Sequence, residues 1–164
     1  MTHSVAGVRG QVSDPEAVIR ETHRWGKAHA AEALLADARV VFGADHLETA
    51  ARHAERARDS SSMITRSVAM ESLLYLSGQS QVSEAIGMAG IRVGSTSVAI
   101  CVFGSIGVDD LIEALGWTRD DNVLDAQGKS LRALGISSAE EATVSEDARR
   151  DLALERTALL DAFR

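Results

Sequence analysis

The sequence has few residues that cross-link or interrupt a chain: among 164 residues there is one cysteine and one proline. A lone cysteine excludes an internal disulfide and fits a reducing compartment. Cys101 lies in SVAICVF, a run typical of a buried strand, so we expect an inert core thiol rather than a nucleophile or metal ligand. With 45% apolar and 25% charged residues, the composition is that of one folded domain over 1–164.

Long apolar runs and an excess of positive charge are also missing. No run approaches the roughly 18 apolar residues of a membrane-spanning helix, and the initial MTHSVAGVRGQ lacks the apolar centre of a signal peptide. We therefore expect a cytoplasmic protein with no membrane contact. The net charge of −7 argues against a broad electrostatic grip on nucleic acid, although Arg52, Arg56 and Arg58 could form a local basic patch.

The sequence contains none of the common motifs for phosphate binding, metal binding or nucleophilic catalysis. There is no phosphate-binding Gly-Lys-Ser/Thr loop, no paired-cysteine metal spacing and no Gly-x-Ser-x-Gly elbow. His46 and His53 lie two helical turns apart, roughly 10 Å, too far for two ligands of one metal ion, so we expect solvated or capping histidines. Glu71 and Glu84 are expected to be surface charges of helices. The sequence thus predicts no catalytic residue, no metal site and no cofactor.

Helical patterns dominate what is present. We expect an α/β or α+β fold in which a small mixed sheet packs against several helices, including a long C-terminal one. The expected helices run from an N-cap at Ser13 to about Trp25, then over 44–59, 63–77, 81–90 and 108–116, with two short pieces in 120–137 and a last helix from Ser145. The expected strands lie in 7–12, 38–42 and 95–104, while 27–43 as a whole is ambiguous between helix and strand.

A polar bend at 77–81 separates two of the most apolar segments. Gly78 suits the end of the first helix and Ser80 suits the N-cap of the next. Gln79 and Gln81 are needed for neither role, and their amides could hydrogen-bond a base edge, a ribose or a partner's backbone. Arg66, which we expect on the preceding helix, could contact a phosphate. These residues alone leave a capped turn and a recognition site both open.

The block MESLLYLSGQSQVSEAIGMAGI resembles the signature of the KEOPS complex regulatory subunit, the PRPK-binding protein (TPRKB-like) family. GVRG, ADARVVFGADHLETAARHA and ALERTALLDAF follow in the family's order, and the short chain resembles the archaeal type. The resemblance favours a strand over a helix for EALLADARVV. The segment 25–33 is longer and more charged than the family's counterpart, and we assign it no role.

The resemblance implies a non-catalytic subunit of the complex that installs threonylcarbamoyladenosine in tRNA. Such a subunit would bind and stimulate a kinase-like ATPase, which contacts the threonylcarbamoyl transferase, and would capture the single-stranded CCA end of tRNA. By position, the RNA-binding residues would be Arg66, Ser77, Gly78, Gln79 and Gln81. The kinase-docking residues would be Ile86, Met88, Ala89, Leu152 and Leu159.

Two other interpretations stay open on the residues alone. The apolar docking residues suit core packing equally well. The chain could also be a small hydrolase or transferase that uses Glu71, Glu84 or a histidine, or a purely structural homodimer.

Overall fold

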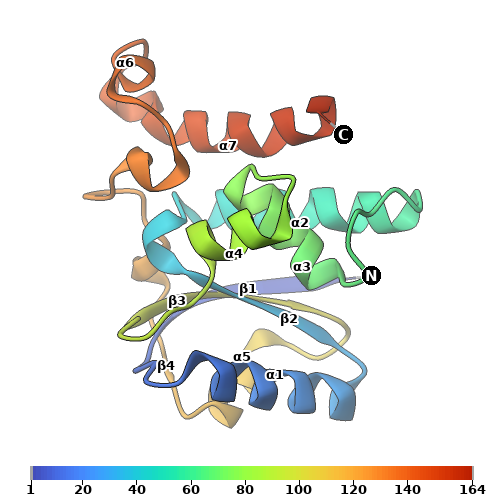
Figure 1. Cartoon of the computed structure of the whole chain (residues 1–164). Helices are drawn as coiled ribbons and strands as arrows, with labels where there is room; N and C mark the ends of the chain where they lie inside the picture. The colour runs from blue at the N-terminus through green and yellow to red at the C-terminus, as the bar shows by residue number, and fades with distance from the viewer. Residues whose placement is uncertain (1, 164) are drawn as a thin grey trace.

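The computed structural model describes residues 2–163, in which a four-stranded sheet carries helices on both faces (Figure 1). The strands are β1 (His3–Arg9), β2 (Glu32–Asp37), β3 (Ser97–Phe103) and β4 (Thr118–Arg119), in the spatial order β2-β3-β1-β4. β3 pairs antiparallel with β1, from His3–Phe103 to Arg9–Ser97, and with β2, from Glu32–Phe103 to Asp37–Val98. β4 pairs antiparallel with β1.

The α+β fold with a small sheet is confirmed, but the predicted mixed sheet is wrong for the described strands, because every pairing is antiparallel. β1 and β2 are joined through a helix and run in the same direction, as in a βαβ unit. β3 lies between them, so neither forms a parallel pair. β2 is therefore left at an edge of the sheet.

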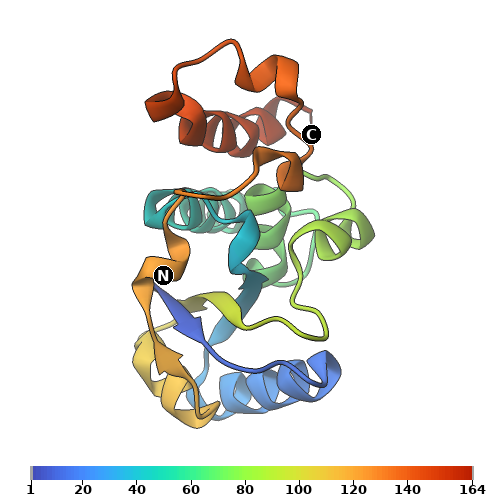
Figure 2. The same ribbon diagram turned by 90° about the vertical axis from the view of Figure 1, so that its left-hand side faces the viewer.

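The helices form layers above and below the sheet in Figure 1. α1 (Pro15–His29) and α5 (Val108–Ala114) cover one face, while α2 (Ala44–Asp59) and α3 (Val68–Ser77) cover the other. α4 (Val82–Ala89) packs beside α3. The short α6 (Ser138–Glu141) and the long α7 (Arg149–Leu159) follow, and α7 adds a further layer on α2 and α3. Figure 2 shows the segment after β4 rising from the level of the sheet to this C-terminal layer.

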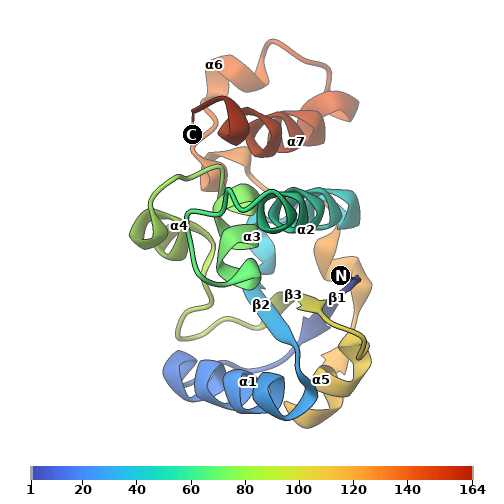
Figure 3. The ribbon, with the colours of Figure 1, turned by 90° about the vertical axis from the view of Figure 1, so that its right-hand side faces the viewer.

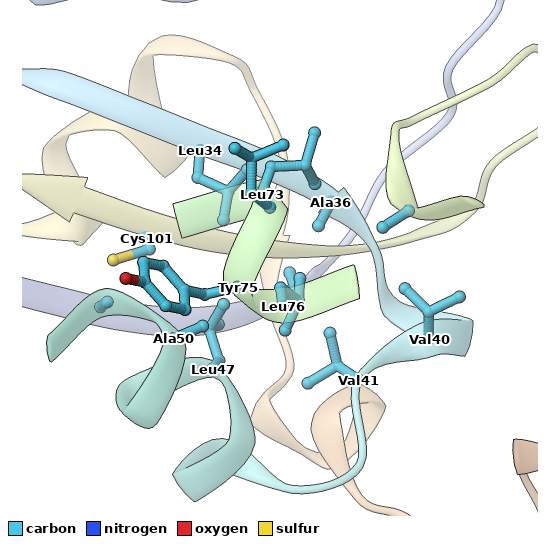
Figure 4. Close-up of a cluster of buried hydrophobic side chains, with 14 of the residues drawn as sticks. Leu34, Ala36, Val40, Val41, Leu47, Ala50, Leu73, Tyr75, Leu76 and Cys101 are labelled. Atoms are coloured by element: carbon cyan, nitrogen blue, oxygen red, sulfur yellow. The ribbon is translucent and has the colours of Figure 1, made fainter. Parts of the chain in front are cut away.

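Both faces of the sheet are buried. Ala99, Cys101 and Phe103 of β3 belong to the core under α2 and α3, whereas the alternate residues of β3 belong to the core against α1 and α5. In Figure 4, Cys101 lies near Tyr75 of α3 and Leu47 of α2. Burial raises the pKa of the Cys101 thiol well above its ordinary value, so the expected inert core thiol is confirmed.

Local side-chain hydrogen bonds move several predicted element boundaries. Asp14 rather than Ser13 caps α1, because its Oδ1 accepts from the backbone N of Ala17 at 3.2 Å. Ser67 caps α3, so residues 63–67 precede the helix instead of opening it. β2 ends at Asp37, whose side chain accepts from the backbone N of Arg39 and starts a 3₁₀ turn over Ala38–Val40, where 38–42 was predicted to be a strand.

The strand predicted over 7–12 is shifted, because β1 ends at Arg9, and the helix predicted from Ser145 begins at Arg149, after a 3₁₀ turn over Glu146–Ala148. The strand over 95–104 and the helices over 44–59 and 108–116 are confirmed, and the strand favoured for EALLADARVV is confirmed over Glu32–Asp37 only. The two short pieces are 3₁₀ turns, Asp121–Leu124 and Leu131–Leu134. The segment 25–33 holds the end of α1 and the start of β2. No helix among the described residues is long and apolar enough to cross a membrane.

Candidate binding surfaces on the two flanks of helix α4

The bend before α4 is closed largely by its own backbone. Gly78 adopts a left-handed conformation (φ 67°) that ends α3, as predicted. Ser77 is wrong as an RNA-binding side chain, because it is 1% exposed and its Oγ donates to the carbonyls of Leu73 and Leu74. Ser80 is not the N-cap of α4: that position is Gln81, which makes no side-chain capping bond. The amide of Gln81 is therefore exposed and not used by the helix.

The other predicted RNA-binding residues lie apart from one another. Arg66 is exposed, but it stands in the segment before α3 rather than on a helix. Gln79 is half-buried, and its Nε2 lies 3.9 Å from Sδ of Met88, to which it donates a weak hydrogen bond. Gly78 lies against Arg156 of α7. Arg66 and Gln79 thus approach different sides of α4.

The predicted docking residues do not form one surface either. Ala89 is fully buried and is corrected to a core residue. Ile86 is 47% exposed, and Met88 is half-buried. Two residues apart in a helix, they project about 200° apart around its axis, so they belong to opposite flanks of α4. Leu152 packs against the main core, and Leu159 is exposed on α7, in a separate layer.

An apolar groove of about 550 Å³ lies on the Ile86 side of α4, and we call it the β2 groove. In Figure 3, α4 and α1 stand on either side of the edge of the sheet formed by β2. Seven large apolar side chains are exposed in the described residues, and four of them line this groove: Ile19, Ile64, Val82 and Ile86. Such a concentration of exposed apolar side chains is typical of a protein-binding surface.

The β2 groove follows an open edge of the sheet. Ala33, Leu34 and Leu35 of β2 line it, and β2 has β3 on one side only. Among the described residues, the outer side of β2 makes a single bridge, between Ala36 and Gly90. Unpaired strand edges offer backbone donors and acceptors to an added strand. The groove therefore combines apolar contacts with backbone hydrogen-bonding capacity.

A basic cleft of about 580 Å³ lies on the Met88 side of α4, and we call it the Asp37 cleft. Its lining includes Gly87 and Met88 of α4, Ser130, and the cations Arg39, Arg92 and Lys129. Asp37 is 2% exposed, and its carboxylate accepts from Nη2 of Arg39 at 2.7 Å and from Nε at 3.1 Å and 3.2 Å. Nε of Arg92 lies 3.6 Å from the same carboxylate.

Lys129 is fixed deeper in this cleft than the arginines. Its Nζ donates to the carbonyls of Val41 and Val123, both at 2.6 Å. Burial lowers the pKa of Lys129 to about 8, against a smaller opposing effect of Asp125 and Asp37. By contrast, the hydrogen bond to Asp37 raises the pKa of Arg39. At neutral pH, the cleft therefore holds three cations around one buried carboxylate.

Other titratable residues serve the fold. Glu71 is buried rather than a surface charge, and its carboxylate accepts from the backbone N of Ile64 and from the backbone N and hydroxyl of Thr65. His46 is buried rather than solvated: it accepts from the backbone N of Phe42, and burial lowers its pKa to about 4. His53 pairs with Asp161 at 2.9 Å and is also largely shielded from solvent. Glu84 is exposed, as predicted.

Metal binding finds no support in the part of the chain that the structure describes, which holds no group of three potential ligands. The cations of the Asp37 cleft were not predicted from the sequence. Arg39, Arg92 and Lys129 are distant from one another along the chain, and no spacing rule connects them. Ile19 and Val82 of the β2 groove were missed too, since isolated apolar residues on helices are ordinarily attributed to the core.

The chain matches a known protein family over most of its length. A model of the family described as Kinase binding protein CGI-121 matches residues 11–133. No curated protein matches the chain. The matched residues include all those that line the β2 groove and the Asp37 cleft, whereas α6 and α7 lie beyond them.

Proposed function

The chain belongs to the kinase binding protein CGI-121 family, and from this premise we propose that it is a non-catalytic subunit that binds a kinase-like ATPase. The single observation that carries the docking surface is the gathering of Ile19, Ile64, Val82 and Ile86 in one groove. Docking would remove these side chains from water, which stabilises a complex by roughly 25 cal/mol per Å² of buried apolar surface.

The occupant that we propose for the β2 groove is an apolar segment of the kinase in an extended conformation. Such a segment would pair with the free edge of β2 at Ala33–Leu35 and place its side chains between α1 and α4. Strand addition uses backbone hydrogen bonds for affinity and flanking pockets for specificity. The groove offers both within the residues matched by the family model.

Beyond kinase binding, we propose that the chain is an archaeal-type regulatory subunit of the KEOPS complex in the cytoplasm. In that complex it would stimulate the ATPase, reach the threonylcarbamoyl transferase indirectly and capture the CCA end of tRNA. The support is the likeness of residues 70–91 to the family's signature. The exposed amide of Gln81 and the half-buried amide of Gln79 suit hydrogen bonds to unpaired bases. Binding that is equal for tRNA with and without its CCA end would contradict CCA capture.

We also propose that the chain contributes no active site of its own. Among the carboxylates considered for catalysis, Glu71 is engaged with the backbone that precedes α3, and Glu84 is exposed on α4. The buried carboxylate of Glu71 is committed to the backbone of residues 64 and 65, and the carboxylate of Glu84 lies in solvent, so neither is positioned to exchange a proton with a bound substrate. Catalysis would then belong to the kinase-like and transferase subunits.

The docking proposal is tested by co-expressing the chain with its kinase-like partner and measuring their affinity. Ile86→Asp should weaken binding by about 30-fold or more, the effect of removing a central interface residue worth about 2 kcal/mol. Its cost to folding should stay below about 1 kcal/mol, because Ile86 is already exposed.

Leu159→Asp is the matched control, since Leu159 is similarly exposed (40%) but lies on α7, outside the groove. It should bind the kinase normally. The proposal would be wrong if Leu159→Asp abolished binding while Ile86→Asp preserved it. Sedimentation of the chain alone would reveal whether a second copy occupies the groove instead.

A further inference from the structure

The Asp37 cleft holds more positive charge than its buried carboxylate needs. One cation in contact is enough to neutralise a buried aspartate, and Arg39 alone makes bidentate contact with Asp37. Arg92 and Lys129 nevertheless line the same cleft. This local excess stands out on a chain whose net charge is −7. Stabilisation of Asp37 therefore accounts for only part of the arrangement.

The two arginines are held in place while part of each guanidinium stays free. The carboxylate of Asp37 accepts from the backbone N and from the guanidinium of Arg39, and the carbonyls of Gly87 and Met88 together with Asp37 hold Arg92. Their side chains are nevertheless 66% and 49% exposed, and within the described residues Nη1 of neither arginine makes a hydrogen bond. Arginines ordered by other contacts lose little entropy on binding, and a guanidinium suits two oxygens of one phosphate.

Arg39 and Arg92 line two adjoining hollows, the Asp37 cleft and a second hollow beside it. This second hollow of about 250 Å³ shares Asp37, Arg39 and Arg92 with the cleft and continues along Gly94, Ser95, Thr96 and Ser97. The depression is thus longer than a single phosphate and has hydroxyl and backbone groups beyond the cations. This shape suits an extended, polyanionic chain better than a small ion.

We infer that the Asp37 cleft and the hollow that continues it form a binding path for the phosphodiester backbone of a single-stranded nucleic acid, with Arg39 and Arg92 gripping one phosphate. Lys129 faces the same path from the side of Ser130. Gln79, which contacts Met88, stands where a base attached to that backbone could be reached. This inference rests on the RNA-binding role proposed above and assigns it residues that the sequence did not indicate.

The test uses the full chain and a fluorescently labelled single-stranded oligoribonucleotide, with affinity measured at several salt concentrations. Arg92→Gln should weaken binding about tenfold, the effect of losing one charge-assisted contact. It should also reduce the slope of log affinity against log salt by about 0.7, because one fewer phosphate is neutralised. Arg92→Lys should recover only part of the loss, since it keeps the charge without the planar fork.

Arg20→Gln serves as the charge control, because Arg20 is an exposed residue of α1 that lines neither surface. It should bind within about twofold of the unmodified chain. An equal loss for Arg20→Gln and Arg92→Gln would mean that only overall charge matters, and would overturn the inference. Arg39→Gln should also weaken oligoribonucleotide binding and is an independent variant in which to measure that loss. Thermal denaturation of each variant shows whether it is folded.

Backbone NMR shifts of the unmodified chain provide a readout that does not depend on any variant. Addition of the oligoribonucleotide should shift amides of Gly87, Gly128 and Ser130, which line the cleft. If inorganic phosphate bound the cleft as tightly as the oligomer, the site would be a single-ion pocket and the path would be wrong. If the oligomer bound but shifted other residues, only the cleft assignment would fail. If no RNA bound at all, the proposed RNA role would fail with it.

Discussion

The β2 groove and the Asp37 cleft lie on opposite flanks of the same short helix and differ in chemistry. The groove gathers Ile19, Ile64, Val82 and Ile86 along an open strand edge, and the cleft gathers three cations around Asp37. Between them, Ala85 and Ala89 bury the third side of α4 against the core. Eight residues, Val82–Ala89, thus suffice to separate an apolar surface from a basic one.

The contrast between an apolar groove and a basic cleft shows how opposite flanks of one helix can suit two different kinds of ligand. Apolar burial holds a protein partner through contact area, whereas fixed arginines hold a polyanion through charge and geometry. Because the two surfaces share α4 but no side chain, each can be altered alone.

The largest expected effect comes from the shared side of α4. Ala89→Asp would bury an unpaired carboxylate at a site with 0% exposure and should destabilise the fold by about 3 kcal/mol or more. Kinase binding and RNA binding should then be lost together. Urea denaturation measures the free energy of unfolding, and Ser83→Asp, on the exposed side of α4, should unfold like the unmodified chain. A stable Ala89→Asp that had lost only kinase binding would restore Ala89 to the docking surface.

Acid should lower the free energy of unfolding, and with it the stability of both surfaces, because the core that supports them contains the buried His46. The pKa of His46 is lowered to about 4 from 6.5, chiefly by burial, so the unfolded chain takes up this proton more readily than the folded one. The folded state is therefore unaffected above pH 6.5 and loses stability as the pH falls from 6.5 towards 4, by about 2 kcal/mol at pH 5.

Urea midpoints at pH 7 and pH 5 check this effect of His46. A His46→Gln variant, whose side chain does not titrate, should lose less stability between the two pH values than the unmodified chain. Equal losses for the two proteins would assign the acid sensitivity to other groups.

The smallest expected effect is a loss of RNA affinity at high pH, which should affect the Asp37 cleft and not the β2 groove. Burial lowers the pKa of Lys129 to about 8, so raising the pH from 7 to 9 removes most of its charge while both arginines stay charged. Affinity for an oligoribonucleotide should fall about threefold, the loss of one partly screened attraction. Fluorescence anisotropy measures it. Lys129→Arg should bind equally at both pH values, and a loss of the same size in that variant would exclude Lys129 as the cause.

The sequence predicted what depends on local pattern. The left-handed Gly78, the continuous apolar run around Cys101 and the acidic first turn of α5 each follow from neighbouring residues, and each was found. The ends of elements were less certain, because single hydrogen bonds decide them. Asp37 ends β2 by bonding the backbone of Arg39, a choice that the composition of ADARVVF does not reveal.

The sites depended on contacts between distant segments and were predicted only in part. Ile86 and Met88 look equivalent in the sequence, yet the packing of Ala85 and Ala89 sends them to different flanks of α4. Glu71 looked like a surface charge, but it is buried, and its carboxylate accepts hydrogen bonds from residues 64 and 65. No local pattern could bring Arg39, Arg92 and Lys129 together, since the fold alone makes them neighbours.

The independence of the two flanks is tested most directly by a crossed binding measurement. The unmodified chain, Ile86→Asp, Arg92→Gln and the double variant are each titrated with the kinase-like partner and with a single-stranded oligoribonucleotide. Ile86→Asp should lose kinase affinity by about 30-fold and keep RNA affinity. Arg92→Gln should keep kinase affinity and lose RNA affinity by about tenfold, and the double variant should show both losses, each unchanged in size. Loss of both ligands by either single variant, with the fold intact, would contradict the separation of the surfaces by α4.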